Sequence, residues 1–175
     1  VGYTGGHAIS NALSFLIKAA SKLKDEKISF VLIGSGNEKS KLIDIVIKKQ
    51  LSNVFFLDQI EKKEIYSMLK NFDVLYIGWQ KKSLYRFGVC PNKLFDYMMA
   101  GKPIIHSITA GNDLVAEANC GISVPAEDED AIAKAILRMK SLSKDEKEVL
   151  GLNGKKYVME HHDYKILAGK FLKLI

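Results

Sequence analysis

Apolar residues follow two different periods along this chain, and the two periods alternate. Residues 30–33 are continuously apolar, whereas Leu42, Ile45 and Val46 fall on one side of a helix. A short apolar run rich in β-branched and aromatic residues is typical of a buried strand, and recurrence every three or four residues is typical of an amphipathic helix. The pattern therefore predicts strands that alternate with helices.

Six strands and a series of helices follow from this reading. The expected strands are residues 1–3, 28–33, 53–57, 74–77, 103–105 and 121–124. The expected helices are residues 9–23, with Ile9 on the inward face, residues 39–50, a segment marked by Ile65, Leu69 and Phe72, a short helix from Asn92, and residues 113–119. A further helix follows the acidic residues 127–130 and has Ile132, Ala135, Ile136 and Met139 on its inward face, and two helices are expected within residues 143–175. Such alternation predicts βαβ units in an α/β fold, a doubly wound parallel sheet of about six strands with helices on both faces. We expect residues 1–175 to form one Rossmann-like domain.

Composition and charge narrow the class of protein. The 175 residues are 47% hydrophobic and carry a formal net charge of +6, which suits one globular domain and could suit nucleic acid, a membrane surface or an anionic ligand. The lysines are spread along the predicted helices without a compact run or interleaved aromatic residues. We therefore expect attraction of an anionic small molecule, and no nucleic acid.

The compartment and the extent of the chain are inferred from a few features. Cys90 and Cys120 are too few and too far apart for a disulfide framework or a metal cluster, which indicates a reducing cytoplasm. No apolar run approaches the length of about 20 residues that spans a bilayer, so a peripheral contact with the inner face of the cytoplasmic membrane is the membrane role left open. The chain begins with Val1 in an expected strand, which predicts a fragment of a longer polypeptide.

Three loops at the carboxyl ends of expected strands are candidates for anion binding. Gly5 and Gly6 follow the first strand and are expected to open the first helix, residues 34–36 follow the second strand, and residues 87–93 precede the helix from Asn92. Ligands of doubly wound sheets bind at this edge, where glycine lets the backbone approach a phosphate. Each glycine loop taken alone is equally typical of a simple turn.

Lys93 and Asp96 lie one helical turn apart and can face the same ligand. The helix macrodipole disfavours a lysine at the start of a helix unless an anion is present, and an ionised carboxylate accepts hydrogen bonds from two hydroxyls of a ribose. The alternative is a surface ion pair between the two side chains. His7 is a weaker candidate for a phosphate contact, and Cys90 has no base near it in the sequence.

Taken together, these residues resemble one enzyme family. The motifs are a Gly-x-x-Gly-Gly turn, Gly34-Ser35-Gly36, Asn53-Val54-x-Phe56-Leu57, Asp73-Val74 and the run from Asn92 to Ile104 that contains Ala100-Gly101-Lys102-Pro103. The chain looks like the C-terminal, donor-binding half of a retaining GT-B glycosyltransferase of family 4. The resemblance covers essentially the whole chain, and it implies a missing N-terminal acceptor domain in a longer two-domain protein.

The resemblance also assigns roles. In this family a Glu-x7-Glu pattern meets the donor sugar and then the ribose; here Asp96 stands at the second position and Gly88 at the first. The diphosphate would be held by Lys93 and Arg86 with the glycine backbones, and the base would lie against Gln59 and Ile60. The implied substrate-binding set is Gly5, Gly6, Gly34, Gln59, Ile60, Arg86, Phe87, Gly88, Asn92, Lys93, Leu94 and Asp96.

The expected function is therefore the donor half of a bacterial, cytoplasmic glycosyltransferase. It would bind a nucleotide-sugar, with UDP favoured, for transfer to a glycan or lipid-linked acceptor in surface polysaccharide synthesis. No metal or other cofactor is expected, no catalytic residue is assigned, and the piece alone should turn over nothing. The alternatives are a sugar-nucleotide epimerase-like enzyme and a non-catalytic nucleotide-binding domain.

Overall fold

The computed structural model describes residues 1–173, and its centre is one parallel sheet. The strands are β1 (Gly2–Thr4), β2 (Phe30–Ile33), β3 (Val54–Leu57), β4 (Leu75–Gly78), β5 (Ile104–Ser107) and β6 (Gly121–Val124). Their order is β3-β2-β1-β4-β5-β6, and every neighbouring pair is parallel. This confirms the predicted doubly wound α/β fold.

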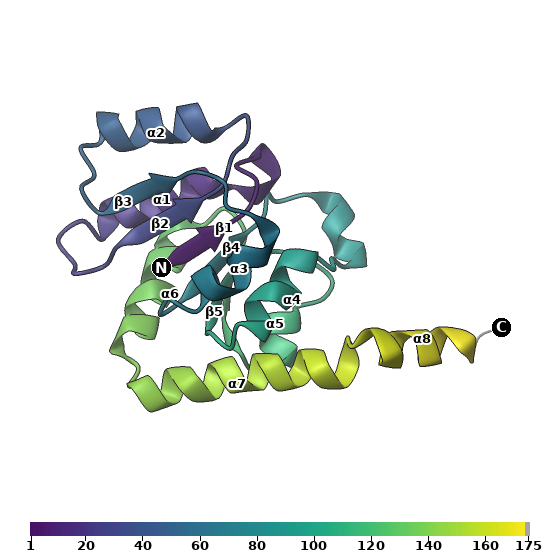
Figure 1. Ribbon diagram of the computed structural model, residues 1–175. Helices are drawn as coiled ribbons and strands as arrows, with labels where there is room; N and C mark the ends of the chain where they lie inside the picture. Colours follow the sequence, from purple (N-terminus) through teal and green to yellow (C-terminus); the bar gives the residue numbers. More distant parts are fainter. Residues whose placement is uncertain (174–175) are drawn as a thin grey trace.

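Helices cover both faces of the sheet (Figure 1). They are α1 (Leu13–Lys22), α2 (Lys39–Lys48), α3 (Lys62–Leu69), α4 (Asn92–Met99), α5 (Leu114–Glu117), α6 (Glu129–Ser141), α7 (Lys144–His161) and α8 (Tyr164–Leu172), with short 3-10 helices η1 (Ile9–Asn11) and η2 (Ser83–Phe87). Helices α1, α2 and α6 share one core cluster, and α3, α4, α5 and α7 share the other. Helix α8 extends beyond the body of the domain (Figure 1).

The adjacent strands β4 and β5 each supply both cores, as expected for strands that are buried on two faces. In β4, Tyr76 belongs to the core under α1 and α6, whereas Leu75 and Ile77 belong to the core under α3 and α4. Alternate side chains of a strand point to opposite faces, so a continuous apolar run is needed to fill both layers. Strands of such a sheet can therefore be recognised in the sequence as unbroken apolar segments.

The expected first helix is interrupted. Ala12 adopts a left-handed conformation with φ of 47°, so the chain forms η1, turns and only then begins α1. Ile9, expected on the inward face, is 61% exposed because it lies before this break. Gly5 and Gly6 therefore do not open a helix, and the anion-binding argument from a helix N-terminus fails for this loop.

Other boundaries agree more closely with the pattern. Helix α6 begins at Glu129, where the Asp128 side chain accepts a hydrogen bond from Ala131 N, and the two C-terminal helices meet at His162 and Asp163. Phe72 lies just after α3 rather than within it. No helix among residues 1–173 is long and apolar enough to cross a membrane.

Candidate functional site

The sheet has its topological switch point between β1 and β4, which lie side by side at its centre although two strands separate them in sequence. Successive connections run outward from this point in opposite directions, which leaves a crevice at the carboxyl ends of the strands. The loops that follow β1, β2, β3 and β4 all open toward that edge. The predicted ligand-binding residues lie on these loops and on α4.

The loop after β1 is fixed by side chains from its own neighbourhood. The Gly6 carbonyl accepts hydrogen bonds from Tyr3 Oη at 2.7 Å and from Asn11 Nδ2 at 2.8 Å. The Gly5 N–H is already bound to the Ile33 carbonyl at 2.9 Å, so it is not free for a phosphate, contrary to the expectation. The Gly6 N–H has no hydrogen-bond partner within residues 1–173 and remains available.

The glycine loops after β1 and β2 lie in contact with one another. A Cβ placed on Gly34 would lie 2.0 Å from the Gly5 carbonyl oxygen, and Gly34 has a φ of +142° that side chains rarely adopt. Glycine is therefore needed at position 34 for close backbone packing. Gly34 shapes the floor of the crevice.

Lys93, in the first turn of α4, reaches across to the loop after β1. Its Nζ donates to Tyr3 Oη at 2.8 Å, lies 4.2 Å from the centre of the Tyr3 ring, and comes close to Gly5. Among the described residues Lys93 forms no ion pair, so the alternative of a pair with Asp96 is not realised. Burial lowers the pKa of Lys93 to about 8. A bound anion would be its first direct counter-charge.

A pocket of about 340 Å³ opens next to these glycines. Its lining residues are Thr4, Gly5, Gly6, Ile33, Gly34, Ser35, Gln59, Ile60, Lys62 and Ile65. Ser35 Oγ donates to Gln59 Oε1 at 2.8 Å and so ties the loop after β3 to the loop after β2. The fold thus brings five predicted residues into one pocket.

Asp96 faces a second hollow that adjoins the first. This hollow, of about 100 Å³, is lined by Asp96, Met99 and residues of α3, and it shares Lys62 and Ile65 with the glycine pocket. Partial burial raises the pKa of Asp96, and the positive charge of Lys62 opposes that shift. Helix α4 therefore presents Lys93 to the glycine loop and Asp96 to α3, so the two side chains flank the site from different sides.

Tyr97 attaches α4 to β1. Its hydroxyl accepts a hydrogen bond from Thr4 N at 2.8 Å and donates to the Thr4 carbonyl at 3.1 Å, in a fully buried position. Because Thr4 is the residue before the Gly5 turn, this contact sets the position of α4 relative to the loop.

A model of one sequence family, described as glycosyl transferases group 1, matches residues 1–141. The chain belongs to this family. No curated protein sequence matches the chain. The family assignment therefore comes from the family model, and the solved structures described next add the fold.

Solved structures share the fold of this group 1 glycosyl transferase domain. A TarM variant from S. aureus, in complex with fondaparinux, alpha-GlcNAc-glycerol and UDP, has a TM-score of 0.83 at 16% identity over 99% of this chain and 34% of its own. HepE from Anabaena, in complex with UDP and glucose, has a TM-score of 0.80 at 15% identity over 99% of this chain and 46% of its own. The C-terminal domain of LpcC from Francisella tularensis has a TM-score of 0.76 at 17% identity over 93% of this chain and 86% of its own.

This chain therefore spans about a third to a half of the length of TarM and HepE, but most of the isolated LpcC domain. Its fold is that of one half of a GT-B glycosyltransferase.

The remaining predicted residues of this group 1 domain lie elsewhere. Leu94 is 1% exposed in the core beneath α4, so its side chain does not reach a ligand. Arg86 lines a separate pocket between the loops after β4 and β5, with its guanidinium 4.5 Å from the ring of the exposed Phe87. Gly88 and the exposed Asn92 line none of the pockets described above. The structure thus separates Arg86 from the Gly5 and Gly6 loop with which it was expected to share a diphosphate.

His7 is buried behind the glycine loop and not in the pocket. Its ring lies between Tyr3 and Phe56, with centroids 5.9 and 5.8 Å away, and neither ring nitrogen has a hydrogen-bond partner within residues 1–173. Burial, assisted by the charges of Lys39 and Lys93, lowers the pKa of His7 to about 4. His7 is therefore neutral at physiological pH.

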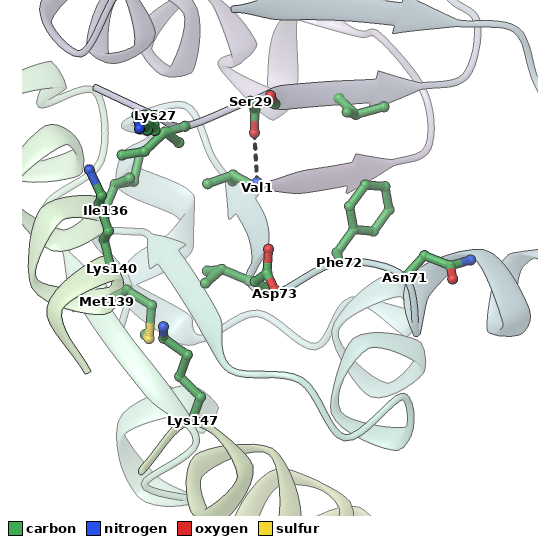
Figure 2. A pocket seen from close by; sticks show the side chains of 13 residues that line it. Val1, Lys27, Ser29, Asn71, Phe72, Asp73, Ile136, Met139, Lys140 and Lys147 are labelled. Carbon is green, nitrogen blue, oxygen red and sulfur yellow. Dashed lines mark hydrogen bonds between the residues drawn. The ribbon is translucent and has the colours of Figure 1, made fainter. Parts of the chain in front are cut away.

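Another hollow, of about 420 Å³, lies at the opposite edge of the sheet (Figure 2). It surrounds the Val1 amino group, which donates to the Ser29 carbonyl at 2.8 Å, and Phe72 and Asp73 form one wall. This is the amino-terminal edge of the strands, where ligands of doubly wound sheets do not bind. No cluster of three or more His, Cys, Asp or Glu residues in the described chain could hold a metal ion.

Sequence reasoning missed several residues that build the site. They are Tyr3, Asn11, Ser35, Lys62 and Tyr97. The rings of Tyr3 and Tyr97 are buried, but the Tyr3 hydroxyl donates to the Gly6 carbonyl and the Tyr97 hydroxyl pairs with the backbone of Thr4 at the end of β1. A buried tyrosine needs a partner for its hydroxyl, and that requirement was the available signal.

Proposed function

We propose that this domain is the donor-binding half of a retaining GT-B glycosyltransferase of family 4 and binds a nucleoside diphosphate sugar, with UDP favoured. The observation that carries the proposal is Lys93, a cation that has no carboxylate partner among residues 1–173 and lies over the glycine loop at the switch point of the sheet. A largely buried cation of this kind is costly unless an anion joins it. A diphosphate supplies that anion.

The parts of the ligand divide among the pocket walls. Lys93, the free Gly6 N–H and the first turn of α4, which no side chain caps, would hold the diphosphate. Asp96 would accept hydrogen bonds from the ribose hydroxyls, and the positive charge of Lys62 favours the ionised form of the Asp96 carboxyl against the effect of partial burial. Gln59 would face the base, held by Ser35.

The chemistry of this half is leaving-group stabilisation. Transfer breaks the bond between the anomeric carbon and a diphosphate oxygen, forms a bond from that carbon to an acceptor oxygen on the same face, and releases the acceptor proton. The pocket's cation and oriented backbone donors would stabilise the negative charge that develops on the diphosphate. Acceptor binding is assigned to the N-terminal half of the longer protein, and a glycan or lipid-linked acceptor at the inner membrane face fits the proposed role in surface polysaccharide synthesis.

The UDP complexes of HepE and TarM support UDP as the first nucleotide to test. Isothermal titration of the chain with UDP, GDP and UDP-sugars should show binding, and Lys93→Ala should weaken UDP about tenfold through loss of a charge-assisted hydrogen bond. Asp96→Ala should weaken UDP more than 2′,3′-dideoxy-UDP, which lacks the hydroxyls.

Matched controls on the exposed surface of α2 are Lys48→Ala and Asp44→Ala, which should change neither affinity. The proposal fails if no nucleotide binds the folded chain, or if the controls weaken binding as much as the site variants do.

A further inference from the structure

A strongly basic pocket lies on the other side of the switch point from the glycine pocket, which is the pocket lined by Gly5, Gly6 and Gly34. Its volume is about 440 Å³, and its lining residues are Lys81, Lys82, Ser83, Arg86, Thr109, Ala110 and Gly111. Three of these side chains are cationic and none is acidic. None of the three cations forms an ion pair with any carboxylate of residues 1–173.

The walls of this basic pocket are locked together by hydrogen bonds. Gly111 N donates to the Tyr85 carbonyl at 2.9 Å, and Asn112 pairs with both backbone groups of Val89, at 2.8 Å to its N–H and 2.9 Å to its carbonyl. A Cβ on Gly111 would lie 2.1 Å from the Arg86 carbonyl oxygen, so the two loops are in direct backbone contact. The loop after β5 therefore holds η2, and with it Arg86, in one place.

A series of contacts connects η2 and the loop after β5 to the sheet. The Tyr85 ring meets Trp79 edge to face at 5.5 Å, and Trp79 Nε1 donates to Nε2 of the buried His106 at 3.2 Å. His106 must then carry its proton on Nδ1, which lies 3.1 Å from Asp113 Oδ1. Asp113 caps α5 at the end of the loop after β5. Both walls of the pocket are thus tied to the same strand.

We propose that this basic pocket binds an anionic group, a carboxylate or a phosphate, carried by the substrate at a distance from the nucleotide. The inference rests on the proposed glycosyltransferase function and narrows its substrate class to acidic ones. Arg86 offers a planar fork that matches carboxylate and phosphate oxygens, and Lys81 and Lys82 add mobile positive charge. Thr109 Oγ1 accepts from Ala126 N and keeps its own hydrogen to donate.

The position of the basic pocket determines which part of a substrate can reach it. It lies at the carboxyl ends of β4 and β5, on the same edge of the sheet as the glycine pocket, and shares no residue with that pocket. An anion there is distinct from the diphosphate held by Lys93. It belongs either to an acidic donor sugar or to a phosphate-bearing acceptor, and Arg86 serves this group instead of the diphosphate.

Two ligand pairs distinguish these sources. For the donor, UDP-glucuronate is compared with UDP-glucose by isothermal titration; for the acceptor, glycerol 3-phosphate is compared with glycerol by amide chemical shifts. The site variant combines Lys82→Gln and Arg86→Gln. The matched control combines Lys48→Gln on α2 and Lys63→Gln on α3, so that two positive charges are removed from each protein. All four side chains are exposed, so both proteins should fold.

We expect at least one acidic ligand to bind the wild-type chain roughly tenfold more tightly than its neutral partner, which is the effect of one charge-assisted hydrogen bond. This preference should vanish in the site variant, persist in the control, and shrink with added salt. For glycerol 3-phosphate, the shifted amides should be those of Ser83 and Gly111.

The proposal is overturned if neither acidic ligand is preferred, if the control loses the preference as well, or if glycerol 3-phosphate shifts only the amides of Gly6 and Lys93. Failure of UDP to bind, with glycerol 3-phosphate still bound beside Arg86, would overturn the nucleotide-sugar function while leaving the anionic site in place.

Discussion

The hydroxyl of Tyr97 pairs with both backbone groups of Thr4, accepting from its N–H at 2.8 Å and donating to its carbonyl at 3.1 Å. Residues 93 positions apart are joined here, and the joint lies one residue before the Gly5 turn. Lys93 stands on the same helix as Tyr97, so the position of its ammonium group over the glycine loop depends on this contact. One tyrosine hydroxyl thus connects the fold to the site.

We predict that Tyr97→Phe destabilises the domain and weakens nucleotide binding together. Loss of the hydroxyl leaves the buried N–H and carbonyl of Thr4 without their partner, which costs about 1–3 kcal/mol. The freed loop should also hold the Gly6 N–H less firmly, so the affinity for UDP should fall severalfold. Urea unfolding and isothermal titration measure the two effects.

A matched control is Tyr164→Phe, because the Tyr164 hydroxyl has no hydrogen-bond partner among residues 1–173 and the side chain is 89% exposed on α8, away from the pockets. Its unfolding free energy and UDP affinity should stay at wild-type values. If Tyr97→Phe behaves like Tyr164→Phe, the Tyr97–Thr4 contact does not position the loop.

We predict that Lys93 makes the binding of a nucleoside diphosphate depend on pH in the alkaline range. Its folded pKa is about 8, below the ordinary value of 10.5, so in the free protein it loses its charge as the pH rises through 8. A bound diphosphate favours the charged form and raises this pKa, so binding takes up a proton above pH 8. The affinity for UDP should fall by up to about tenfold per pH unit between pH 8 and 10.

Titrations at pH 7, 8, 9 and 10 test this, with Lys93→Met as the comparison. The variant should bind more weakly at pH 7 and show no fall above pH 8. A wild-type affinity that stays constant to pH 10 would show that Lys93 does not meet the anion. The same pKa makes the folding stability of the free wild-type domain rise between about pH 8 and 10.5, because the unfolded chain holds the proton that the folded chain has lost.

The architecture was predictable from the sequence because a sheet buried on both faces needs unbroken apolar strands. Strand β6 was placed at its observed bounds, and the inward positions Ile132, Ala135, Ile136 and Met139 of α6 are all buried. The placement of Lys93 and Asp96 one turn apart on α4 follows from helical spacing alone, whereas their roles stay predictions. These features depend on residues that are close in sequence, so they can be predicted without knowing the contacts between distant segments.

What the sequence could not reveal depends on contacts between distant segments. Nothing in the pattern around Ala12 signals a left-handed residue, so the first helix was drawn through it. The Gly5 N–H was counted as free because its partner, the Ile33 carbonyl, belongs to another strand. The separation of Arg86 from the glycine loop likewise follows from the bonds of Gly111 and Asn112, which lie more than twenty residues further along the chain.

Gly34 should tolerate no side chain. Its backbone conformation is strained for alanine, and the new Cβ would press on the Gly5 carbonyl at 2.0 Å. We predict that Gly34→Ala lowers the unfolding free energy by more than about 2 kcal/mol, since neither backbone can move without breaking the sheet. Gly6→Ala is the control, because its Cβ would meet only the Ser35 carbonyl oxygen at 4.0 Å. Thermal unfolding of the two variants should differ clearly, and equal melting temperatures would contradict the packing argument.

His7 should make the domain sensitive to mild acid. Its pKa is about 4 in the folded protein and 6.5 in the unfolded chain, so the unfolded chain binds a proton first as the pH falls. The stabilising contribution is present above pH 6.5 and is lost progressively toward pH 4, by roughly 1–2 kcal/mol. His7→Leu, of similar volume and equally suited to the space between Tyr3 and Phe56, should show a shallower loss of unfolding free energy between pH 6.5 and 4.5 than the wild type.

An NMR titration of the His7 ring gives an independent measure, because the pKa of the ring should lie near 4. If the pKa instead lies near 6.5, and the stability curves of the wild type and His7→Leu run parallel, the ring is not held in a dry, unpartnered site.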